Sequence, residues 1–189
     1  MSKILKEQIP KLLKENTDLT FFEMGAGSGI NLKTALSLGI KKENIFSSDI
    51  DKESVSYCKL LGFNCINSDL FENIPGKIRH DPNSEDRLIK KNRGFLYDII
   101  IFNPPYLPED AREPKNSRLA TTGGKKGNEI TKLFLRQAKK YLKKTGVIFL
   151  ITSSLAENIN FEKLGYKAKE IGYEKLFFEK LFIWELKVI

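Results

Sequence analysis

The segment IIIFNPPY, residues 99–106, combines side chains that could hold and orient an amino group. Its apolar run is typical of a buried strand. The strand must stop at Asn103, because the two prolines that follow lack an N–H and keep the residue before each of them extended. The Asn103 amide oxygen and the carbonyls of Pro104 and Pro105 would form a rim of hydrogen-bond acceptors for an NH₂ group, and Tyr106 would offer a flat face to a planar amide or base. The pattern predicts that a poorly nucleophilic nitrogen is oriented here toward an activated methyl group.

The sequence FEMGAGSGINL, residues 22–32, predicts a glycine-rich turn between a strand and a helix. Gly25, Gly27 and Gly29 would let the backbone turn tightly and approach a ligand without a Cβ in the way. A dinucleotide fingerprint would place its third glycine one residue later, where this chain has Ile30. That departure, with no evident Tyr/Lys or His dyad, argues against a nicotinamide-dependent oxidoreductase.

Acidic residues close two further expected strands. Asp49 could accept hydrogen bonds from both hydroxyls of a ribose, and Asp69 could accept from the exocyclic amine of an adenine. In doubly wound sheets, ligands bind at the carboxyl ends of the strands, which is where Glu23, Asp49, Asp69 and Asn103 all fall. The four positions together predict an adenosine-containing ligand at this edge of a sheet.

The elements that must position these residues alternate between strand and helix. Strands are expected at residues 20–24, 44–49, 63–68, 97–102, 147–152, 167–171 and 176–188, and the main helices at about 29–38, 52–61 and 128–144. Strands separated by helices favour a parallel sheet covered on both faces, but the last two strands are too close together for a helical crossover. We therefore expect an α/β, doubly wound, mostly parallel seven-stranded sheet with an antiparallel C-terminal hairpin.

The length and composition suit one domain. The chain has 189 residues, 41% of them hydrophobic and 30% charged. We expect a single domain over residues 1–189, with a short amphipathic N-terminal helix at about residues 2–16 that places Ile4, Leu5, Ile9, Leu12 and Leu13 roughly on one face. Residues 72–94 are rich in Lys, Arg, Asp and Asn, which predicts an exposed basic insertion. His80, the only histidine, lies in it without a visible catalytic partner.

Charge and cysteine content exclude some classes of protein. The net charge of +8 could attract nucleic acid or an acidic partner, but its lysines also fit the solvated faces of helices. No apolar run approaches the length of a membrane span, and the N-terminus lacks the apolar core of a signal peptide. Cys58 and Cys65 form no metal-ligand spacing and no disulfide framework, so we expect small buried side chains in a reducing, cytoplasmic setting and no metal site.

The order of these motifs resembles the class I S-adenosylmethionine-dependent methyltransferases that act on amino groups, and among them the HemK-like protein-glutamine methyltransferases. The resemblance covers about residues 18–155, and the stretch GGKKG, residues 123–127, is similar to a GGxxG stretch of that family. Only about 17 residues precede the first expected strand, as in the short archaeal and eukaryotic form. The resemblance implies catalytic roles for Asn103, Pro104, Pro105 and Tyr106. It implies cofactor contacts for Glu23, Gly25, Ala26, Gly27, Gly29, Asp49, Ile50, Asp69, Leu70 and Asn103.

The same resemblance implies a substrate and a partner. The substrate would be the GGQ glutamine of a class I translation release factor, with S-adenosyl-L-methionine as the cofactor. The partner would be a small zinc-ribbon activator protein. In the expected strand order the third strand lies at a sheet edge, so the activator could extend the sheet near residues 63–68, with Phe63 and Cys65 adding apolar contact.

Two alternatives stay open at this stage. One is an enzyme that methylates an exocyclic amine of RNA or DNA, adenine N6 or guanine N2, on a flipped or single-stranded base. The positive charge favours it, whereas the lack of a target-recognition domain and the GGKKG stretch disfavour it. The other is a non-catalytic nucleotide-binding scaffold, against which the intact segment Asn103–Tyr106 argues.

Overall fold

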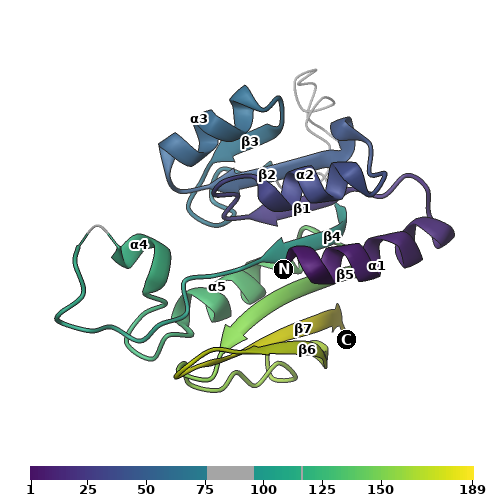
Figure 1. Ribbon diagram of the computed structural model, residues 1–189. Coiled ribbons are helices and arrows are strands. Elements are labelled where there is room, and N and C mark those ends of the chain that lie inside the picture. The colour runs from purple at the N-terminus through teal and green to yellow at the C-terminus, as the bar shows by residue number, and fades with distance from the viewer. Residues whose placement is uncertain (76–95, 116) are drawn as a thin grey trace, which may run out of the picture.

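The computed structural model describes residues 1–75, 96–115 and 117–189, which form one sheet with helices on both faces (Figure 1). The strands are β1 (Phe21–Met24), β2 (Ile45–Asp49), β3 (Asn64–Asn67), β4 (Tyr97–Phe102), β5 (Leu142–Ser153), β6 (Tyr166–Lys175) and β7 (Lys180–Val188). The helices are α1 (Ser2–Glu15), α2 (Ile30–Ser37), the 3₁₀ turn η1 (Lys42–Asn44), α3 (Lys52–Leu60), α4 (Arg118–Thr121) and α5 (Glu129–Ala138).

The strand order is β3-β2-β1-β4-β5-β7-β6. Strands β1 to β5 pair in parallel, and β7 lies antiparallel between β5 and β6. The predicted mostly parallel sheet with an antiparallel C-terminal hairpin is therefore confirmed. Because β1 pairs with both β2 and β4, the strand order reverses there, and a crevice for a ligand forms at the carboxyl ends of strands that diverge in this way.

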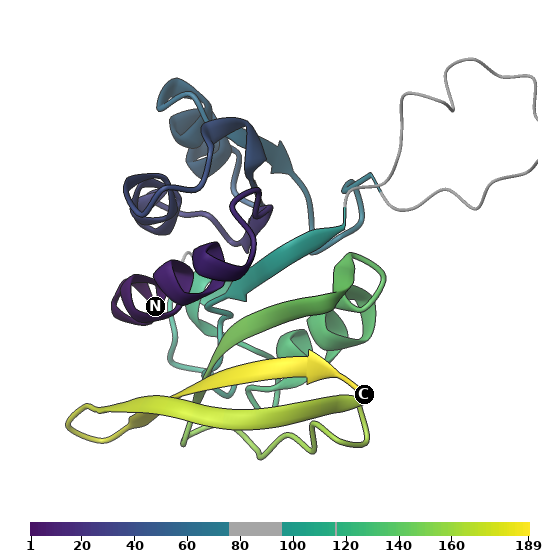
Figure 2. The ribbon, with the colours of Figure 1, turned by 90° about the vertical axis from the view of Figure 1, so that its right-hand side faces the viewer.

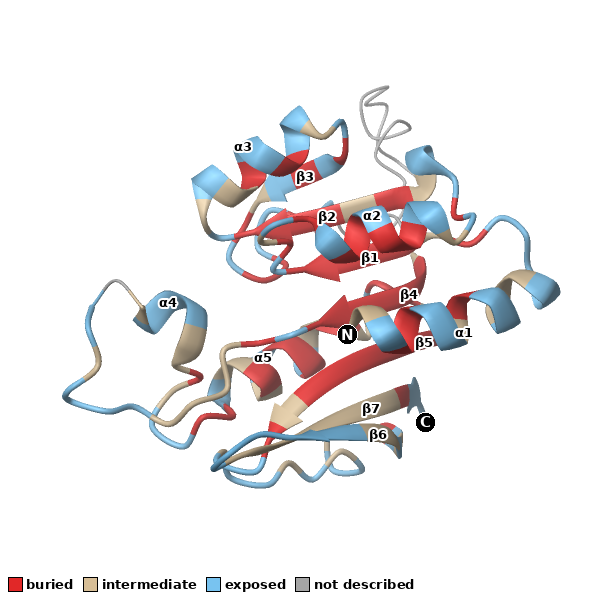
Figure 3. Cartoon of the chain, in the orientation of Figure 1, coloured by how far each residue is buried: buried red, intermediate tan, exposed pale blue. Residues whose placement is uncertain are grey.

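Two apolar clusters hold the helices to the sheet. Helices α1, α2 and α3 lie on one face of the sheet, and α5 lies on the other (Figure 2). Every residue of β1 and β4 is buried, which explains why both strands are runs of large apolar residues rather than alternating patterns (Figure 3). These two strands form the rigid base from which the glycine turn and Asn103 extend.

The boundary between α5 and β5 differs from the prediction. The helix was expected to continue to Lys144, but it ends at Ala138 and β5 begins at Leu142. Tyr97 explains the change, because its N–H donates to the Tyr141 carbonyl oxygen at 2.7 Å and Tyr97 pairs with Leu142 across the sheet. Lys143 adds an ion pair with the buried Asp98 at 2.7 Å. Pairing with β4 thus extends β5 through residues whose apolar spacing also fits a helix.

The C-terminal hairpin is longer than expected on its first strand and shorter on its second. β6 runs to Lys175 and β7 begins at Lys180, so Leu176–Glu179 form the connecting turn, closed by the Leu176 N–H and the Glu179 carbonyl oxygen at 2.7 Å. The side chains at its tip are open to solvent: Phe177 is 100% exposed and Phe178 is 90% exposed. The turn lies at the same edge of the sheet as the carboxyl ends of β4 and β5 (Figure 1).

The third strand lies at the end of the sheet, as expected, but one detail of that expectation is wrong. Phe63 and Cys65 are 5% and 3% exposed, because both pack into the cluster beneath α1, α2 and α3. They therefore offer no apolar contact to a partner, whereas Asn64 and Ile66 are exposed. Cys58 and Cys65 are free thiols in this cluster, which confirms that they serve as small buried side chains.

The predicted basic insertion, with His80, lies almost wholly outside the described residues. Its first few positions are described, and there Ile74 is buried in the cluster beneath α5. Within the described ranges, no helix has the length and apolar character needed to cross a lipid bilayer.

Candidate active site

The glycine turn after β1 is folded back onto the end of β2. The N–H groups of Gly25 and Ala26 donate to the Ser48 carbonyl oxygen at 2.8 and 3.0 Å, and the Gly27 N–H donates to Asp49 Oδ2 at 2.8 Å. Gly27 has a φ of +48°, and a Cβ there would have no protein atom within 4 Å. Packing does not demand glycine at this point. Glycine suits this position because the backbone is left-handed and because a residue without a Cβ leaves the space in front of it open to a ligand.

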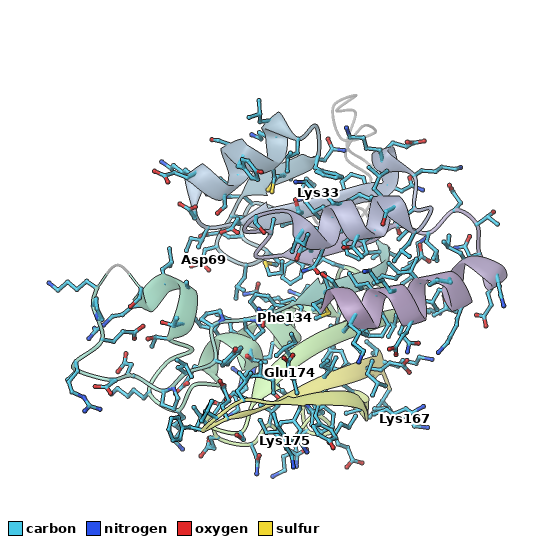
Figure 4. The ribbon with its side chains drawn as sticks, in the orientation of Figure 1. Lys33, Asp69, Phe134, Lys167, Glu174 and Lys175 are labelled. Atoms are coloured by element: carbon cyan, nitrogen blue, oxygen red, sulfur yellow. The ribbon has the colours of Figure 1, made fainter. Side chains whose placement is uncertain are left out.

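A cavity of about 470 Å³, hereafter the first cavity, opens in front of this turn. It is bounded by the turn, the ends of β2, β3 and β4, and the helix α4, and Asp69 lies at the edge of the sheet that faces α4 (Figure 4). Its volume falls in the range of small-molecule sites. The predicted residues that line it are Gly25, Gly27, Asp49, Ile50, Asp69, Leu70, Asn103 and Pro105.

Asp49 links the turn to α3. Its Oδ2 accepts from Gly27, and its Oδ1 accepts from the Asp51 N–H at 2.9 Å. Asp51 in turn caps α3 by accepting from the Ser54 hydroxyl and from the Ser54 N–H, the latter at 2.8 Å. The hydrogen bond from the hydroxyl, and then that from the amide, lower the pKa of Asp51. Asp51 and Ser54 also line the first cavity, although sequence reasoning did not assign them to it. The signal was available, since an acid two residues after a strand-end acid is well placed to cap the next helix.

Glu23 does not line the first cavity but lies behind the turn, 4% exposed. One carboxylate oxygen accepts from Asn31 Nδ2 at 2.7 Å, and the other is buried with no partner among the described residues. Burial raises the pKa of Glu23 to about 8, against the opposing effect of the Asn31 hydrogen bond. Asn31 also accepts from the Ser2 hydroxyl at 2.7 Å, so α1 and α2 are both tied to this carboxyl group.

Ala26 and Gly29 also lie outside the lining of the first cavity. Ala26 is buried, and a Cβ on Gly29 would come within 3.3 Å of the Cys58 sulfur. Leu70 does line the cavity, and it has a φ of +45°, a conformation that side-chain-bearing residues rarely adopt. Such strain is typical of binding sites, and no sequence pattern indicated it here.

Asn103 extends from β4 into the first cavity. The residue before it, Phe102, is buried and packs on Phe134 of α5 (labelled in Figure 4), with ring centroids 4.6 Å apart. Within the described part of the chain, the Asn103 side chain makes no hydrogen bond, so its amide group is available to a ligand. Pro104 is buried and Pro105 lines the same cavity, but Tyr106 lines a different one. The segment Asn103–Tyr106 therefore separates two cavities.

The GGKKG turn packs directly against that segment. A Cβ on Gly123 would lie 2.6 Å from the Pro105 carbonyl oxygen, and a Cβ on Gly127 would lie 2.4 Å from that of Tyr106. The Gly123 N–H also donates to the Leu107 carbonyl oxygen at 2.9 Å. These glycines are required because the two backbones touch, so the turn fixes the position of the proline segment.

Residues 107–115 and 117–122 belong to the loop that carries α4, and this loop borders the first cavity. The loop closes at its base where the Leu107 N–H donates to the Thr121 carbonyl oxygen at 2.8 Å. Inside it, Glu113 accepts from the hydroxyls of Ser117, Thr121 and Thr122, and these contacts lower its pKa, those of Thr121 and Thr122 most strongly. Leu119 and Ala120 of α4 form a wall of the cavity that sequence reasoning missed, because a four-residue helix leaves no periodic pattern.

This arrangement can bind a compact ligand with hydroxyl and amine groups beside an amide acceptor rim. A seven-stranded sheet in this order, with a glycine turn after β1 and an Asn-Pro-Pro-Tyr segment after β4, defines a class I methyltransferase. The Mtq2–Trm112 complex from E. cuniculi, described as responsible for methylation of the termination factor eRF1, has the same fold. It superposes with a TM-score of 0.58 over 97% of this chain and 94% of that chain, at 15% identity.

Comparison of sequences gives the family. A family model described as the Eco57I restriction-modification methylase matches residues 43–172. A protein of Methanocaldococcus jannaschii, provisionally named a protein N5-glutamine methyltransferase, is 34% identical over 93% of this chain and 87% of its own length. The eRF1 methyltransferase catalytic subunit mtq2 of Schizosaccharomyces pombe is 30% identical over 74% of this chain, which spans 61% of that protein. The chain belongs to the protein N5-glutamine methyltransferase family, and most of its length also fits the Eco57I methylase family.

Proposed function

We propose that this enzyme transfers a methyl group from S-adenosyl-L-methionine to the side-chain amide nitrogen of the GGQ glutamine in a class I translation release factor. The observation that carries the proposal is the free amide group of Asn103 at the lip of the first cavity, held in place by the GGKKG turn. The name of the Methanocaldococcus jannaschii relative supports glutamine as the acceptor, and that of the Schizosaccharomyces pombe relative supports eRF1, a termination factor, as the kind of substrate.

The described residues fit this cofactor. The Gly27 position leaves room for a ligand against the backbone, Asp49 suits the ribose hydroxyls, and Asp69 suits the adenine amine. Glu23 would lie behind the turn, near the methionine end of the ligand. S-adenosylmethionine would supply an electrophilic methyl group, and this chain would supply orientation.

Asn103 and the Pro104 carbonyl would grip the two hydrogens of the acceptor amide. Hydrogen bonds to both hydrogens would hold the nitrogen lone pair toward the first cavity and weaken its conjugation with the carbonyl group. A strong base is unnecessary, because the amide proton becomes acidic once nitrogen bears positive charge.

The test offers labelled S-adenosylmethionine and the purified chain, with and without a small zinc-ribbon protein, to a class I release factor and, separately, to total RNA and DNA. We expect label on the release factor that disappears when its GGQ glutamine is replaced. Label that persists after that replacement, or label on nucleic acid alone, would contradict the proposal.

We propose further that a small zinc-ribbon protein binds at β3 and extends the sheet. Support comes from the position of β3 at the end of the sheet and from the structural neighbour, which was solved in complex with Trm112. The exposed Asn64 and Ile66 would provide its side-chain contacts. Full activity of the isolated, monomeric chain on a release factor would contradict this partner.

A second candidate is methylation of an exocyclic amine of a nucleic-acid base. The match to the Eco57I methylase family favours it, since the matched residues include the whole segment Asn103–Tyr106. The net charge of +8 would assist binding of a polyanion. The nucleic-acid arm of the labelling experiment decides between the two acceptors.

A further inference from the structure

A second cavity, of about 320 Å³, lies on the other side of the proline segment from the first. Tyr106, the start of α5, the end of β5 and the strands β6 and β7 contribute to its lining. Four of its residues are aromatic: Tyr106, Phe161, Phe182 and Trp184. The ring centroids of Phe161 and Trp184 are 5.0 Å apart, and those of Phe182 and Trp184 are 6.2 Å apart. The volume is at the small end of ligand sites and suits a single side chain rather than a nucleotide.

An unused hydrogen-bond acceptor is built into its wall. Asn128 is 1% exposed, and its Nδ2 donates to the Glu157 carbonyl oxygen at 2.6 Å. That bond fixes the orientation of the amide, because the opposite orientation would place two oxygens against each other. Asn128 Oδ1 is left buried with no partner in the described chain, which is costly unless a donor arrives from outside.

The charged groups of the second cavity are acidic. Among the described residues that line it, none is a lysine or arginine, and two are glutamates. Glu157 is neutralised by Lys126 at 2.7 Å and Lys132 at 3.4 Å. Glu170 has neither a hydrogen bond nor an ion pair in the described ranges, so its charge is available.

The aromatic face already attracts a cation at its outer edge. The Lys180 ammonium lies 4.5 Å from the centroid of the Phe182 ring and 4.1 Å from that of Tyr173. Lys180 is not part of the lining, and Phe161 and Trp184 have no such cation in the described structure. Aromatic faces with a nearby carboxylate are a general means of binding ammonium and guanidinium groups.

We infer that the second cavity binds the cationic side chain, arginine or lysine, of the protein whose amide is methylated on the other side of Asn103–Tyr106. The cation would lie against Phe161 and Trp184, donate to Asn128 Oδ1 and pair with Glu170. The inference depends on the proposed function only in that the methyl acceptor is a protein. It adds a specificity contact that the reacting amide alone cannot provide.

The binding test needs no methyl transfer. Trp184 is the only tryptophan of the chain, so its fluorescence reports on this cavity. The probes are the N-acetyl amides of arginine, lysine and citrulline, the last being the uncharged counterpart of arginine. We expect a saturable change for a cationic probe, with a dissociation constant on the order of 1 mM for so small a ligand. Citrulline should bind about tenfold more weakly, and the better cationic probe identifies the side chain.

Two matched variants test the site itself. Glu170→Gln should weaken the cationic probe roughly fivefold and leave citrulline unchanged, whereas Glu174→Gln, the same change outside the cavity on the same strand, should alter neither. Lys180→Met should strengthen the cationic probe, because it removes a like charge. Equal binding of arginine and citrulline, no saturable signal with either cation, or equal effects of the two glutamate variants would overturn the inference.

The kinetic test separates this inference from the proposed function. With a release factor as acceptor, Glu170→Gln should raise KM about fivefold with kcat unchanged. Changing the arginine or lysine of the acceptor that binds in the second cavity to glutamine should then raise KM strongly for the wild-type enzyme and only slightly for Glu170→Gln. Probe binding without methylation of the release factor would refute only the proposed function; methylation without coupling to any basic residue would refute only this inference.

Discussion

Asn103 is the residue on which the proposed chemistry depends. Because its side chain makes no hydrogen bond in the described structure and is exposed, Asn103→Ala should leave the unfolding midpoint nearly unchanged. We expect kcat to fall by about 10²–10³, the usual effect of removing one group that stabilises a transition state. Calorimetric affinity for S-adenosylmethionine should stay close to that of the wild type. Equal losses of turnover and cofactor affinity would show that Asn103 shapes the first cavity rather than the reaction.

The glycines of the two turns should respond differently to the same substitution. Gly27→Ala strains a left-handed backbone by about 1–2 kcal/mol but meets no neighbour, so it should mainly weaken cofactor binding. Gly127→Ala places a methyl group 2.4 Å from the Tyr106 carbonyl oxygen. It should cost roughly 3 kcal/mol in unfolding free energy and abolish methyl transfer, because the proline segment must move. Urea unfolding and cofactor titration of both variants check this, and indistinguishable profiles would refute it.

Glu23 should make stability depend on pH. Its pKa is about 8 in the folded chain and near 4.5 when unfolded, so between these values the folded chain holds a proton that the unfolded chain has released. Stability is therefore full below pH 4.5 and falls as pH rises toward 8, by about 1.4 kcal/mol per pH unit.

The check on Glu23 is a difference between variants. Glu23→Gln keeps the acceptor for Asn31 and should remove this slope in urea unfolding between pH 5.5 and 7.5, whereas Glu43→Gln, at an exposed carboxyl, should keep it. A slope that survives in Glu23→Gln would mean that another group titrates.

At the scale of residues, the sequence indicated the lip of the first cavity better than its walls. Asp49, Asp69 and Asn103 could be placed because each ends a recognisable strand, and parallel strands bring their ends together. Neither the place of Leu119 nor the strained backbone of Leu70 could be predicted, since both depend on a loop conformation and not on a period. That Tyr106 faces a second cavity depends on the course of the chain after two prolines, which no local pattern specifies.

At the scale of elements, the conformation of the loop that carries α4 depends on the carboxylate of Glu113. Glu113→Ala removes the shared acceptor of three hydroxyls and should let α4 move away from the first cavity. The affinity for S-adenosylmethionine should fall several-fold with little change in the unfolding midpoint, because the loop is largely exposed.

Asp110 provides the control for that loop. It lies in the same segment, but among the described residues its side chain pairs only with the exposed Arg112, and such surface pairs contribute little. Asp110→Ala should therefore bind the cofactor like the wild type. If both variants lose affinity equally, Glu113 has no special role in the loop.

Elements whose apolar spacing fits one kind of secondary structure were predictable. A stretch whose sequence fits both a helix and a strand was not. β4 was placed to the residue because its unbroken apolar run, Ile99–Phe102, fits a buried central strand. The stretch from Lys139 to Gly146 contains both helical spacing and lysines that either structure tolerates, and only the partner strand β4 decides between them. Tertiary pairing overrides local preference there.

At the scale of the whole molecule, the first and second cavities lie on opposite sides of the segment Asn103–Tyr106 that follows β4. The first cavity uses residues from Met24 to Ile130, whereas the second cavity also needs β6 and β7. β7 lies between β5 and β6, so the last strand of the chain is an interior one. The sequence predicted the hairpin but could not reveal that it completes a second cavity.

The interior place of β7 has a consequence for synthesis on the ribosome. Chains emerge N-terminal part first, at about 5–20 residues per second. Every residue that lines the first cavity has been made well before Lys180, so a nascent chain could acquire its cofactor before it can select an acceptor. Phe182 and Trp184 arrive only with the final strand. Under the roles proposed for the two cavities, the residues that select the acceptor are therefore among the last to be synthesised.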